Sequence, residues 1–349
     1  MSRNAVAIVS SLLFAALAAA LVITPVPYVA WRPGQTVDVM GTTDSGPIIA
    51  VAGGLPSYPS EGQLLMTTVS ATRVESTISL PEALVVYLGA GSDAIPREVY
   101  YPPGKTIEQV RAEATLQMDN SRTLATVAAL RAEGGVTVTE VPSVGAVSLT
   151  GPAADKLLPG DIIESVNNQP VETVDDVAQA VARHSPGDTI TFTFQRDGRQ
   201  RSEAVTAAPS GSNPRGVEVG VRWDVGYQYS PQVTFGIDPA VTGPSAGLVF
   251  ALGIYDRITE GDLLGGRVVA GTGSIDASGR VGHIGGIREK ITGAERDGAT
   301  IFLVPERNCL DIGDLDTDLT LIRVATFKDA VAALQLINEG NYAEVPTCG

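Results

Sequence analysis

Ser245 is the residue in this chain whose surroundings best suit nucleophilic chemistry. It lies in the pentapeptide Gly-Pro-Ser-Ala-Gly, between a segment rich in β-branched residues and an apolar stretch with helical periodicity. We expect Ser245 in the first turn of that helix, where backbone N–H groups lack helical partners and the helix dipole favours an oxyanion. This setting fits a nucleophile whose reaction generates an oxyanion. Capping or packing at a glycine-rich helix start is the alternative role.

Lys290 is the second candidate, on a helix predicted to follow Gly285 and Gly286. It shares a spacing of i, i+3, i+4 and i+7 with Ile287, Ile291 and Ala294, which places it on the apolar face. Burial there lowers the pKa of the amine, so that a neutral base becomes available near physiological pH. The alternative is that the aliphatic part of the Lys290 side chain packs on the apolar face while its ammonium group extends into water.

The other charged residues of this helix are expected to face elsewhere: Arg288, Glu289, Glu295 and Arg296. Upstream of the helix, Thr272 lies in Gly-Thr-Gly-Ser-Ile, at the start of a predicted hairpin that closes near His283.

The order and spacing of these motifs resemble the proteolytic domain of Lon proteases, peptidase family S16. The resemblance covers about residues 216 to 336, from GPSAG through TGSIDASGRVGHIGGIREKITGAERDGATIFLVPERN. It implies a ribosomal protein S5 domain 2-like fold, with Ser245 as nucleophile, Lys290 as general base and Thr272 orienting the lysine. Two positions depart from the family pattern. Thr242 replaces an Asp before GPSAG, and His283 replaces a Pro, which leaves His283 as an alternative base.

Residues 134 to 209 resemble a PDZ domain. The matching motifs are Gly151-Pro-Ala-Ala, Leu158-Pro-Gly-Asp-Ile-Ile, a helix capped by Thr173, and a closing strand pair. This resemblance implies binding of an extended peptide by strand addition. A Gly-Leu-Gly-Phe-like carboxylate-binding loop is not recognisable, so a spacing or inhibitory role stays open.

The N-terminal segment is long and apolar enough to span a bilayer. Ala5 to Ile23 carries no charge and would form a helix of roughly 28 Å, about the hydrocarbon thickness. Tyr28 and Trp31 follow where interfacial aromatic residues occur, and Arg3 favours a cytoplasmic N-terminus. We predict an uncleaved anchor over residues 1–32, with the rest of the chain extracytoplasmic. A cleaved signal peptide is the alternative.

The remaining regions complete an α+β multidomain chain. Residues 33–133 are predicted to form a separate membrane-proximal α/β region with a helix from 106 to 133, and residues 210–216 a linker. The proteolytic domain is expected at 217–338, followed by a tail at 339–349 that lacks an apolar stripe. Cys309 and Cys348 are compatible with one disulfide in an oxidising compartment or with two free thiols.

Composition limits the partners and cofactors. The 349 residues hold 24 Lys and Arg against 39 Asp and Glu, a net charge of −15, so nucleic acid is not an expected partner. The two histidines cannot build a multi-histidine metal site, and the chain has no GxxxxGK[ST] nucleotide loop. We therefore expect no cofactor and no ATP motor within this chain.

The favoured hypothesis is an ATP-independent, membrane-anchored serine endopeptidase with PDZ-mediated selection of protein or peptide substrates. With the anchor and the PDZ region, the chain is similar to membrane-anchored, PDZ-containing Lon-like proteases of bacteria, and Lon resemblance implies a hexamer. An α/β-hydrolase esterase also fits G-x-S-x-G, but only His283 follows Ser245 and too few strands remain. A catalytically silent PDZ assembly protein is the third hypothesis, which the presence of both Ser245 and Lys290 disfavours.

Overall fold

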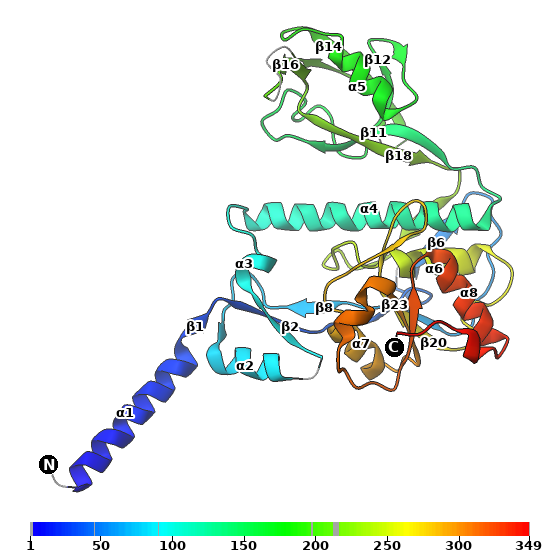
Figure 1. Cartoon of the computed structure of the whole chain (residues 1–349). Helices are drawn as coiled ribbons and strands as arrows, with labels where there is room; N and C mark the ends of the chain where they lie inside the picture. The colour runs from blue at the N-terminus through cyan, green and yellow to red at the C-terminus, as the bar shows by residue number, and fades with distance from the viewer. Residues whose placement is uncertain (1–2, 45, 90, 197, 212–215, 349) are drawn as a thin grey trace. The chain divides into compact units, whose positions relative to one another are not determined.

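The computed structural model of the chain describes residues 3–44, 46–89, 91–196, 198–211 and 216–348 (Figure 1). They form two compact units. The first combines residues up to 135 with residues from 231 onward, and the second comprises 136–230. The second unit is therefore inserted into the first, between two segments that fold together.

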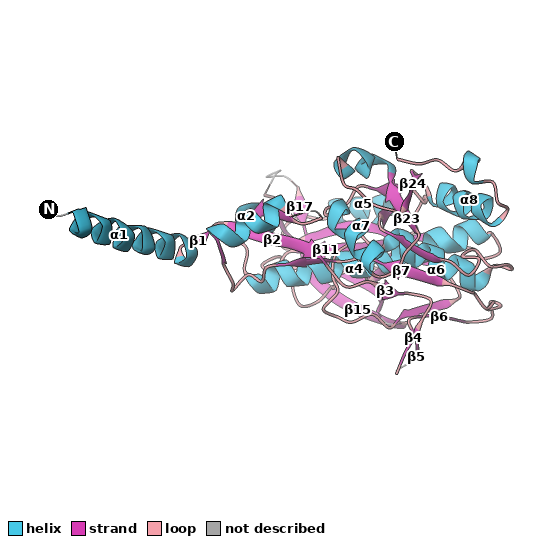
Figure 2. Cartoon of the chain, turned by 90° about the horizontal axis from the view of Figure 1, so that it is seen from below, coloured by secondary structure: helices cyan, strands magenta, loops and turns pink. Residues whose placement is uncertain are grey.

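The first unit is built on a mixed sheet in the order β24-β23-β20-β7-β3 (Figure 2). Its strands, in that order, are Thr320–Val324, Ile301–Pro305, Val268–Gly271, Gln63–Met66 and Val37–Asp38. All neighbours are parallel except β3 and β7, and Leu65 of β7 is paired with Ala270 of β20. The prediction of a separate region at 33–133 is wrong, because β7 pairs directly with a strand of the proteolytic region.

Three helices of this unit carry or adjoin the site described below: α4 (Ile107–Glu133), α6 (Gly247–Ile258) and α7 (Ile287–Arg296). A further helix, α8 (Phe327–Asn338), packs against α6. The predicted helix after Thr106 is confirmed as α4. Thr106 and Gln109 form a capping box at its start, and Gly134 ends it with a left-handed φ of 86°. The buried C-terminal half of α4 packs against α6, so this long helix is an integral part of the unit.

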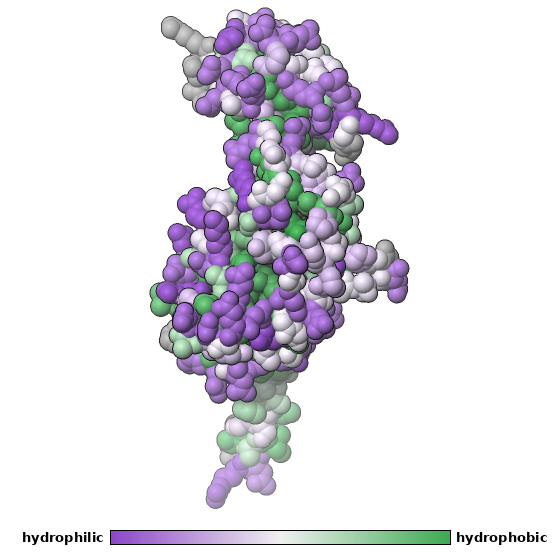
Figure 3. Space-filling model, turned by 90° about the vertical axis from the view of Figure 1, so that its right-hand side faces the viewer, coloured by the Kyte–Doolittle hydropathy of each residue, from purple (hydrophilic) through white to green (hydrophobic). Residues whose placement is uncertain are grey.

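The N-terminal part of the first unit begins with α1 (Arg3–Ile23), β1 (Pro25–Val26) and β2 (Tyr28–Pro33). In the described chain, α1 alone is long and apolar enough to cross a membrane, judged by length and composition. None of its side chains is buried, and Figure 3 shows its mostly apolar surface at the foot of the view. Strand β2 lies between β8 (Val69–Ala71) and β10 (Asp93–Pro96).

Short elements complete this unit. They are β4 (Thr42–Thr43), β5 (Gly46–Pro47), β6 (Ile49–Ala52), β9 (Ile78–Ser79), α2 (Leu80–Leu88), α3 (Arg97–Tyr100), β19 (Gln232–Phe235), β21 (Ser274–Ile275), β22 (Val281–Gly282), η1 (Glu306–Ile312) and η2 (Tyr342–Glu344). The predicted hairpin after Thr272 is confirmed by antiparallel β21 and β22. Strand β19, the first element after the inserted unit, pairs with β6 from the start of the chain.

The second unit contains one helix, α5 (Val174–Ala182), and a sheet in the order β15-β14-β12-β11-β18 among the residues described. Its strands are β11 (Thr139–Val147), β12 (Ile162–Val166), β13 (Gln169–Pro170), β14 (Thr189–Arg196), β15 (Arg199–Thr206), β16 (Ala208–Pro209), β17 (Val217–Glu218) and β18 (Val221–Gln228). Thr173 caps α5, as the sequence predicts. Phe192, Phe194 and Ile163 lie in the core of this unit.

The predicted boundaries of the second unit require correction. Strand β18 pairs with β11 from Thr139↔Gln228 to Val147↔Val221, so residues 217–228 belong here and not to the proteolytic domain. Alternating residues in this stretch fit either sheet, and the sequence pattern alone does not reveal the partner strand. Residues 212–215 of the predicted linker lie outside the described residues.

The C-terminal tail is attached to the sheet by both covalent and backbone bonds. The sulfurs of Cys309 and Cys348 are joined at 2.03 Å. In addition, Cys348 N–H donates to Leu321 C=O at 3.0 Å, and Arg323 N–H donates to Pro346 C=O at 2.9 Å. Hence the tail extends the open edge of β24 despite its lack of an apolar stripe.

We predict that this disulfide is present in exported protein and stabilises the first unit. Replacing both Cys309 and Cys348 with Ser should lower the free energy of unfolding by about 3 kcal/mol, because the bond closes a loop of 39 residues. Mass spectrometry of non-reduced peptides tests the bond, and urea unfolding of the double variant tests its energy. Two freely alkylated thiols in the exported protein would contradict the prediction.

Candidate active site

The sequence predicts Ser245 in the first turn of a helix. In the structure, Ser245 lies instead in the turn that leads into α6. The helix begins at Gly247, with Ala246 as its N-cap. The carbonyl of Ser245 accepts hydrogen bonds from Gly273 N–H at 2.8 Å and Thr272 Oγ1 at 3.1 Å. It is thus bound to the segment after β20, while the carbonyl of Ala246 accepts the first helical bond from Phe250 N–H.

The structure brings together the three predicted site residues Ser245, Thr272 and Lys290. Nζ of Lys290 lies 2.9 Å from Oγ of Ser245 and 3.0 Å from Oγ1 of Thr272. These side chains come from three places: the turn before α6, the residue after β20, and the middle of α7. Thr272 also donates to the Ser245 carbonyl, so it links the amine to the backbone of the serine turn.

Burial controls the protonation of Lys290. Only 3% of the residue is exposed, on the same helix face as the buried Ile287 and Ile291, as the spacing predicts. Desolvation lowers its pKa from 10.5 to about 7, and the nearby charge of Glu289 acts in the opposite direction. A substantial fraction of the amine is therefore neutral at pH 7, with a lone pair available for a proton.

Glu289 contradicts the expected polar faces of α7. It is 3% exposed, whereas the sequence places it on a solvated face with Arg288. Packing of α7 against β2 buries it, close to the start of the helix at Gly286, and this burial raises the pKa of its carboxyl group. The helical spacing identifies the core-facing stripe, but it does not show that a second element covers the adjacent face.

Two residues of α4 support the serine turn, and sequence reasoning did not identify them. Ser121 Oγ donates to Pro244 C=O at 3.1 Å, and Gly243 N–H donates to Ala114 C=O at 3.1 Å. Gly247 allows this close approach, because a Cβ there would lie 2.8 Å from Ile275 and 3.0 Å from Ser121 Oγ. Ser121 lies in the polar run Asp119-Asn-Ser-Arg-Thr123, so the sequence gives no signal that sets it apart.

Ser245 and Lys290 line a cavity of about 1140 Å³ within the first unit. The N-terminal half of α4, the segment after β7, the loop before α6 and Trp31 of β2 form its walls. His283 and Thr242 also line this cavity. The His283 ring is more than half exposed, and its Nε2 lies 2.8 Å from Asp311 Oδ2. In the hydrogen bonds of the described residues, Ser245 is paired with Lys290 and not with His283.

Two family models match this chain. The model of the Lon protease (S16) C-terminal proteolytic domain matches residues 234–336, and the PDZ domain model matches residues 115–206. The chain contains a Lon-type proteolytic domain and a PDZ domain. The PDZ match begins within α4 of the first unit and ends before β18, whereas the compact second unit extends from 136 to 230.

Curated proteins similar to the chain include Lon proteases. Lon protease 2 of Herpetosiphon aurantiacus is 42% identical over 77 residues, which cover 22% of this chain and 9% of that protein. Lon protease of Chloroflexus aurantiacus is 39% identical over 103 residues, covering 27% and 12%. Lon protease 1 of Bacillus subtilis is 32% identical over 161 residues, covering 44% and 20%. The matches thus span a small part of these relatives.

Solved structures similar to the chain include PDZ domains. The PDZ domain of the SdrC-like protein from Listeria monocytogenes is 17% identical, covers 24% of this chain and 86% of that chain, and has a TM-score of 0.22. A solution structure of a Geobacillus thermodenitrificans protein is 30% identical, covers 24% of this chain and 95% of that chain, and also has a TM-score of 0.22.

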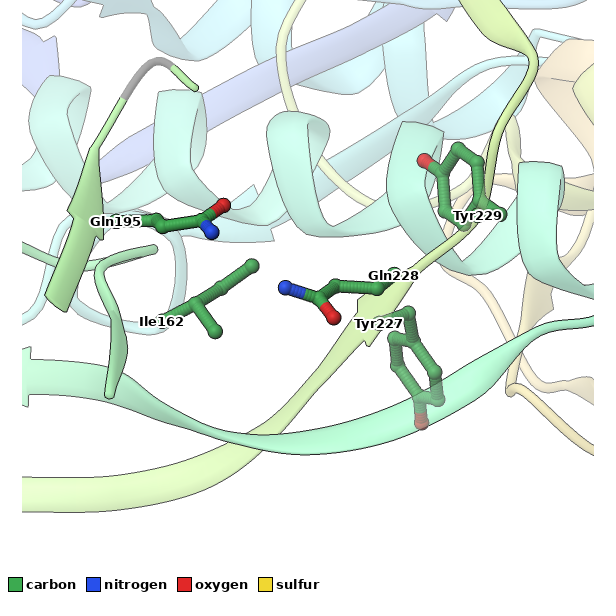
Figure 4. A pocket seen from close by; sticks show the side chains of 5 residues that line it. All are labelled: Ile162, Gln195, Tyr227, Gln228 and Tyr229. Atoms are coloured by element: carbon green, nitrogen blue, oxygen red, sulfur yellow. The ribbon is translucent and has the colours of Figure 1, made fainter. Parts of the chain in front are cut away.

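The PDZ-containing unit presents an open sheet edge. In the described residues β18 is the last strand of its sheet, and α5 packs against it. Figure 4 shows a separate hollow of about 530 Å³ near the end of β18, lined by Ile162, Gln195, Tyr227, Gln228 and Tyr229. Its lining offers two phenols and two amides, but no carboxylate, amine or thiol.

We predict that the buried amine destabilises the fold at neutral pH. The unfolded chain holds the Lys290 proton up to pH 10.5 and the folded chain only to about 7, so stability should rise with pH across that window. Lys290→Met should remove this rise and stabilise the chain at pH 7 by on the order of 2 kcal/mol. Urea unfolding of both proteins at pH 7 and pH 9 measures the effect. A variant less stable than wild type at pH 7 would contradict it.

Proposed function

We propose that the chain is a serine endopeptidase in which Ser245 is the nucleophile and Lys290 the general base. The observation that carries this proposal is the 2.9 Å contact between Oγ of Ser245 and a buried amine whose pKa is about 7. Such a pair needs no metal or cofactor to activate the hydroxyl group. Thr272 acts as a positioning residue, since it holds the amine and the serine backbone together.

The proposed reaction has two stages. The Lys290 amine takes the proton of the Ser245 hydroxyl while Oγ forms a bond to the substrate carbonyl carbon, and N–H groups near the start of α6 stabilise the oxyanion. The ammonium then protonates the leaving amine as the peptide C–N bond breaks, which leaves an acyl-enzyme. In the second stage, Lys290 takes a proton from water, hydroxide adds to the ester carbonyl, and the proton returns to Oγ as the acid product leaves.

Membrane anchoring and an extracytoplasmic location form part of the proposal. Support for them comes from α1, which has the length and composition of a span, from Arg3 at its short end, and from the Cys309–Cys348 bond. The proposed substrates are extracytoplasmic or membrane-associated proteins with flexible segments. Chemistry at a serine-lysine pair requires no nucleotide energy, so the proposed activity is independent of ATP. Assembly into a hexamer remains an expectation from Lon resemblance.

The proposed role of the PDZ domain is selection of substrates. The open edge of β18 beside α5 can accept an extended peptide as an additional strand, which is the binding mode of PDZ domains. A bound substrate would then be held at a raised effective concentration near the peptidase. The alternative role, inhibition, predicts faster cleavage once the PDZ domain is removed.

We predict that Ser245→Ala abolishes hydrolysis of a fluorogenic peptide and leaves the fold intact, because only the attacking oxygen is lost. Lys290→Arg should also be inactive, since a guanidinium group stays protonated at working pH. For the wild type, kcat/KM should rise about tenfold per pH unit below 7 and level off above it. Labelling with a fluorophosphonate should require both residues. Full activity of Lys290→Arg would identify His283 as the base instead.

A second prediction concerns ATP and the PDZ domain. Removing residues 136–230 and joining Gly135 to Pro231 through a short glycine linker should change cleavage of a protein substrate more than cleavage of a short peptide. The physical reason is that only the protein substrate can occupy both sites at once. Both rates should be unaffected by added ATP and Mg²⁺. Dependence of peptide hydrolysis on ATP would contradict the proposal, and unchanged rates for both substrates would exclude a PDZ role in selection.

A further inference from the structure

Helix α2 (Leu80–Leu88) buries two apolar residues and exposes several others. Ala83 and Val86 face the interior, where they pack with Ile78 and Ala30. Four large residues face outward: Leu84, Val85, Tyr87 and Leu88. Val85 is 72% exposed and Leu88 is 78% exposed. We call these four residues the α2 face.

The α2 face carries no charge. Glu82 is the single charged residue of α2, and it pairs with Arg32 of β2 at 2.7 Å. A helix that lies on the surface of a soluble protein normally shows charged or polar residues on its outer side. A contiguous apolar surface of this kind marks a place where the protein meets another apolar phase.

The fold places α2 at the end of the apolar helix α1. Two residues after Ile23, β1 pairs with β9 in the register Pro25↔Ser79 and Val26↔Ile78. Ser79 is also the N-cap of α2, accepting a hydrogen bond from Glu82 N–H. Figures 1 and 2 both show α2 close to β1 and to the C-terminal end of α1. The start of α2 is therefore fixed beside the point where α1 ends.

We propose that the α2 face lies in the headgroup region of the same bilayer that α1 spans. This inference rests on the proposed membrane anchoring. Leucine, valine and tyrosine side chains without charge suit that boundary, because their apolar parts leave water while the tyrosine hydroxyl remains hydrated. The absence of basic residues on the face, together with the net charge of −15, points to zwitterionic lipid as the partner.

This contact would hold the active-site cavity close to the membrane. Strand β2 runs from Tyr28 to Pro33 and contributes Trp31 to the cavity wall. Trp31 is eight residues beyond Ile23, and an extended chain of that length spans at most about 28 Å. Because the α2 face would keep the cavity near the bilayer, the expected substrates are polypeptide segments that emerge from that bilayer.

The test places a reporter on the α2 face in the full chain. Val85→Cys is labelled with an environment-sensitive fluorophore, and Leu116→Cys, an exposed apolar position on α4, is the matched control. The proteins are reconstituted in phosphatidylcholine vesicles with and without brominated acyl chains, which quench at short range. We expect quenching at position 85 several-fold greater than at position 116, with blue-shifted emission at position 85.

Three other results would contradict the inference, and each has a different consequence for the proposed anchor and the proposed peptidase. Equal, weak quenching at both positions in protein that resists carbonate extraction would leave the anchor intact but exclude α2 docking. Blue-shifted emission at position 85 without quenching would show that a second copy covers the face. Release of the chain by carbonate would contradict the proposed membrane anchor. In that case, Ser245-dependent hydrolysis of a soluble peptide would still support the proposed peptidase activity.

A second measurement connects the contact to activity. Val85→Glu combined with Leu88→Glu changes two exposed side chains that contact neither Ser245 nor Lys290, so the fold and the hydrolysis of a soluble peptide should be unchanged. Cleavage of the same peptide tethered to the vesicle by a lipid should fall several-fold. Equal rates on the tethered peptide for the variant and the wild type would contradict the proposed role in access.

Discussion

The burial of the Lys290 amine is the constraint on which the rest of the first unit depends. An amine removed from water near neutral pH must lose its proton or be compensated, and its pKa of about 7 reflects that cost. The surrounding fold offsets the cost with apolar packing on α7 and with two hydroxyl partners. A lysine on a solvated helix face would stay charged and could not serve as a base. The proposed reactivity of Lys290 would therefore be obtained at the expense of stability.

Helix α4 holds the turn that carries Ser245 in a fixed position beside the Lys290 amine. Its C-terminal half is packed on α6, and its N-terminal half lines the cavity. Ala114 and Ser121 of this helix bond to the serine turn. The turn is thus held from α4 on one side and from Thr272 and Gly273 on the other. Fixing the turn in this way limits the freedom of Oγ relative to the amine, which is the geometric condition for proton transfer.

Residue types and spacing predicted the local features and missed several long-range ones. The helix periodicity around Lys290 placed it on the apolar face, and Thr173 marked the start of α5. The partner of a β-strand, by contrast, is not encoded in its alternation. For that reason β18 was assigned to the wrong unit, and β7 was separated from the sheet that contains it. The burial of Glu289 was missed for the same reason, since it depends on β2, far away in the sequence.

The insertion of the second unit also determines when the proteolytic fold can form. The Thr67 hydroxyl, just after β7, donates to the carbonyl of Gly271, the last residue of β20, across 204 residues of sequence. The whole of residues 136–230 is synthesised between these two strands, and Ser245 and Lys290 both follow it. The inserted unit has its own core and can fold while the protease sheet still lacks its later strands. A nascent chain can therefore carry a folded second unit before the sheet of the first unit is complete, and Ser245 and Lys290 can come together only when synthesis is nearly finished.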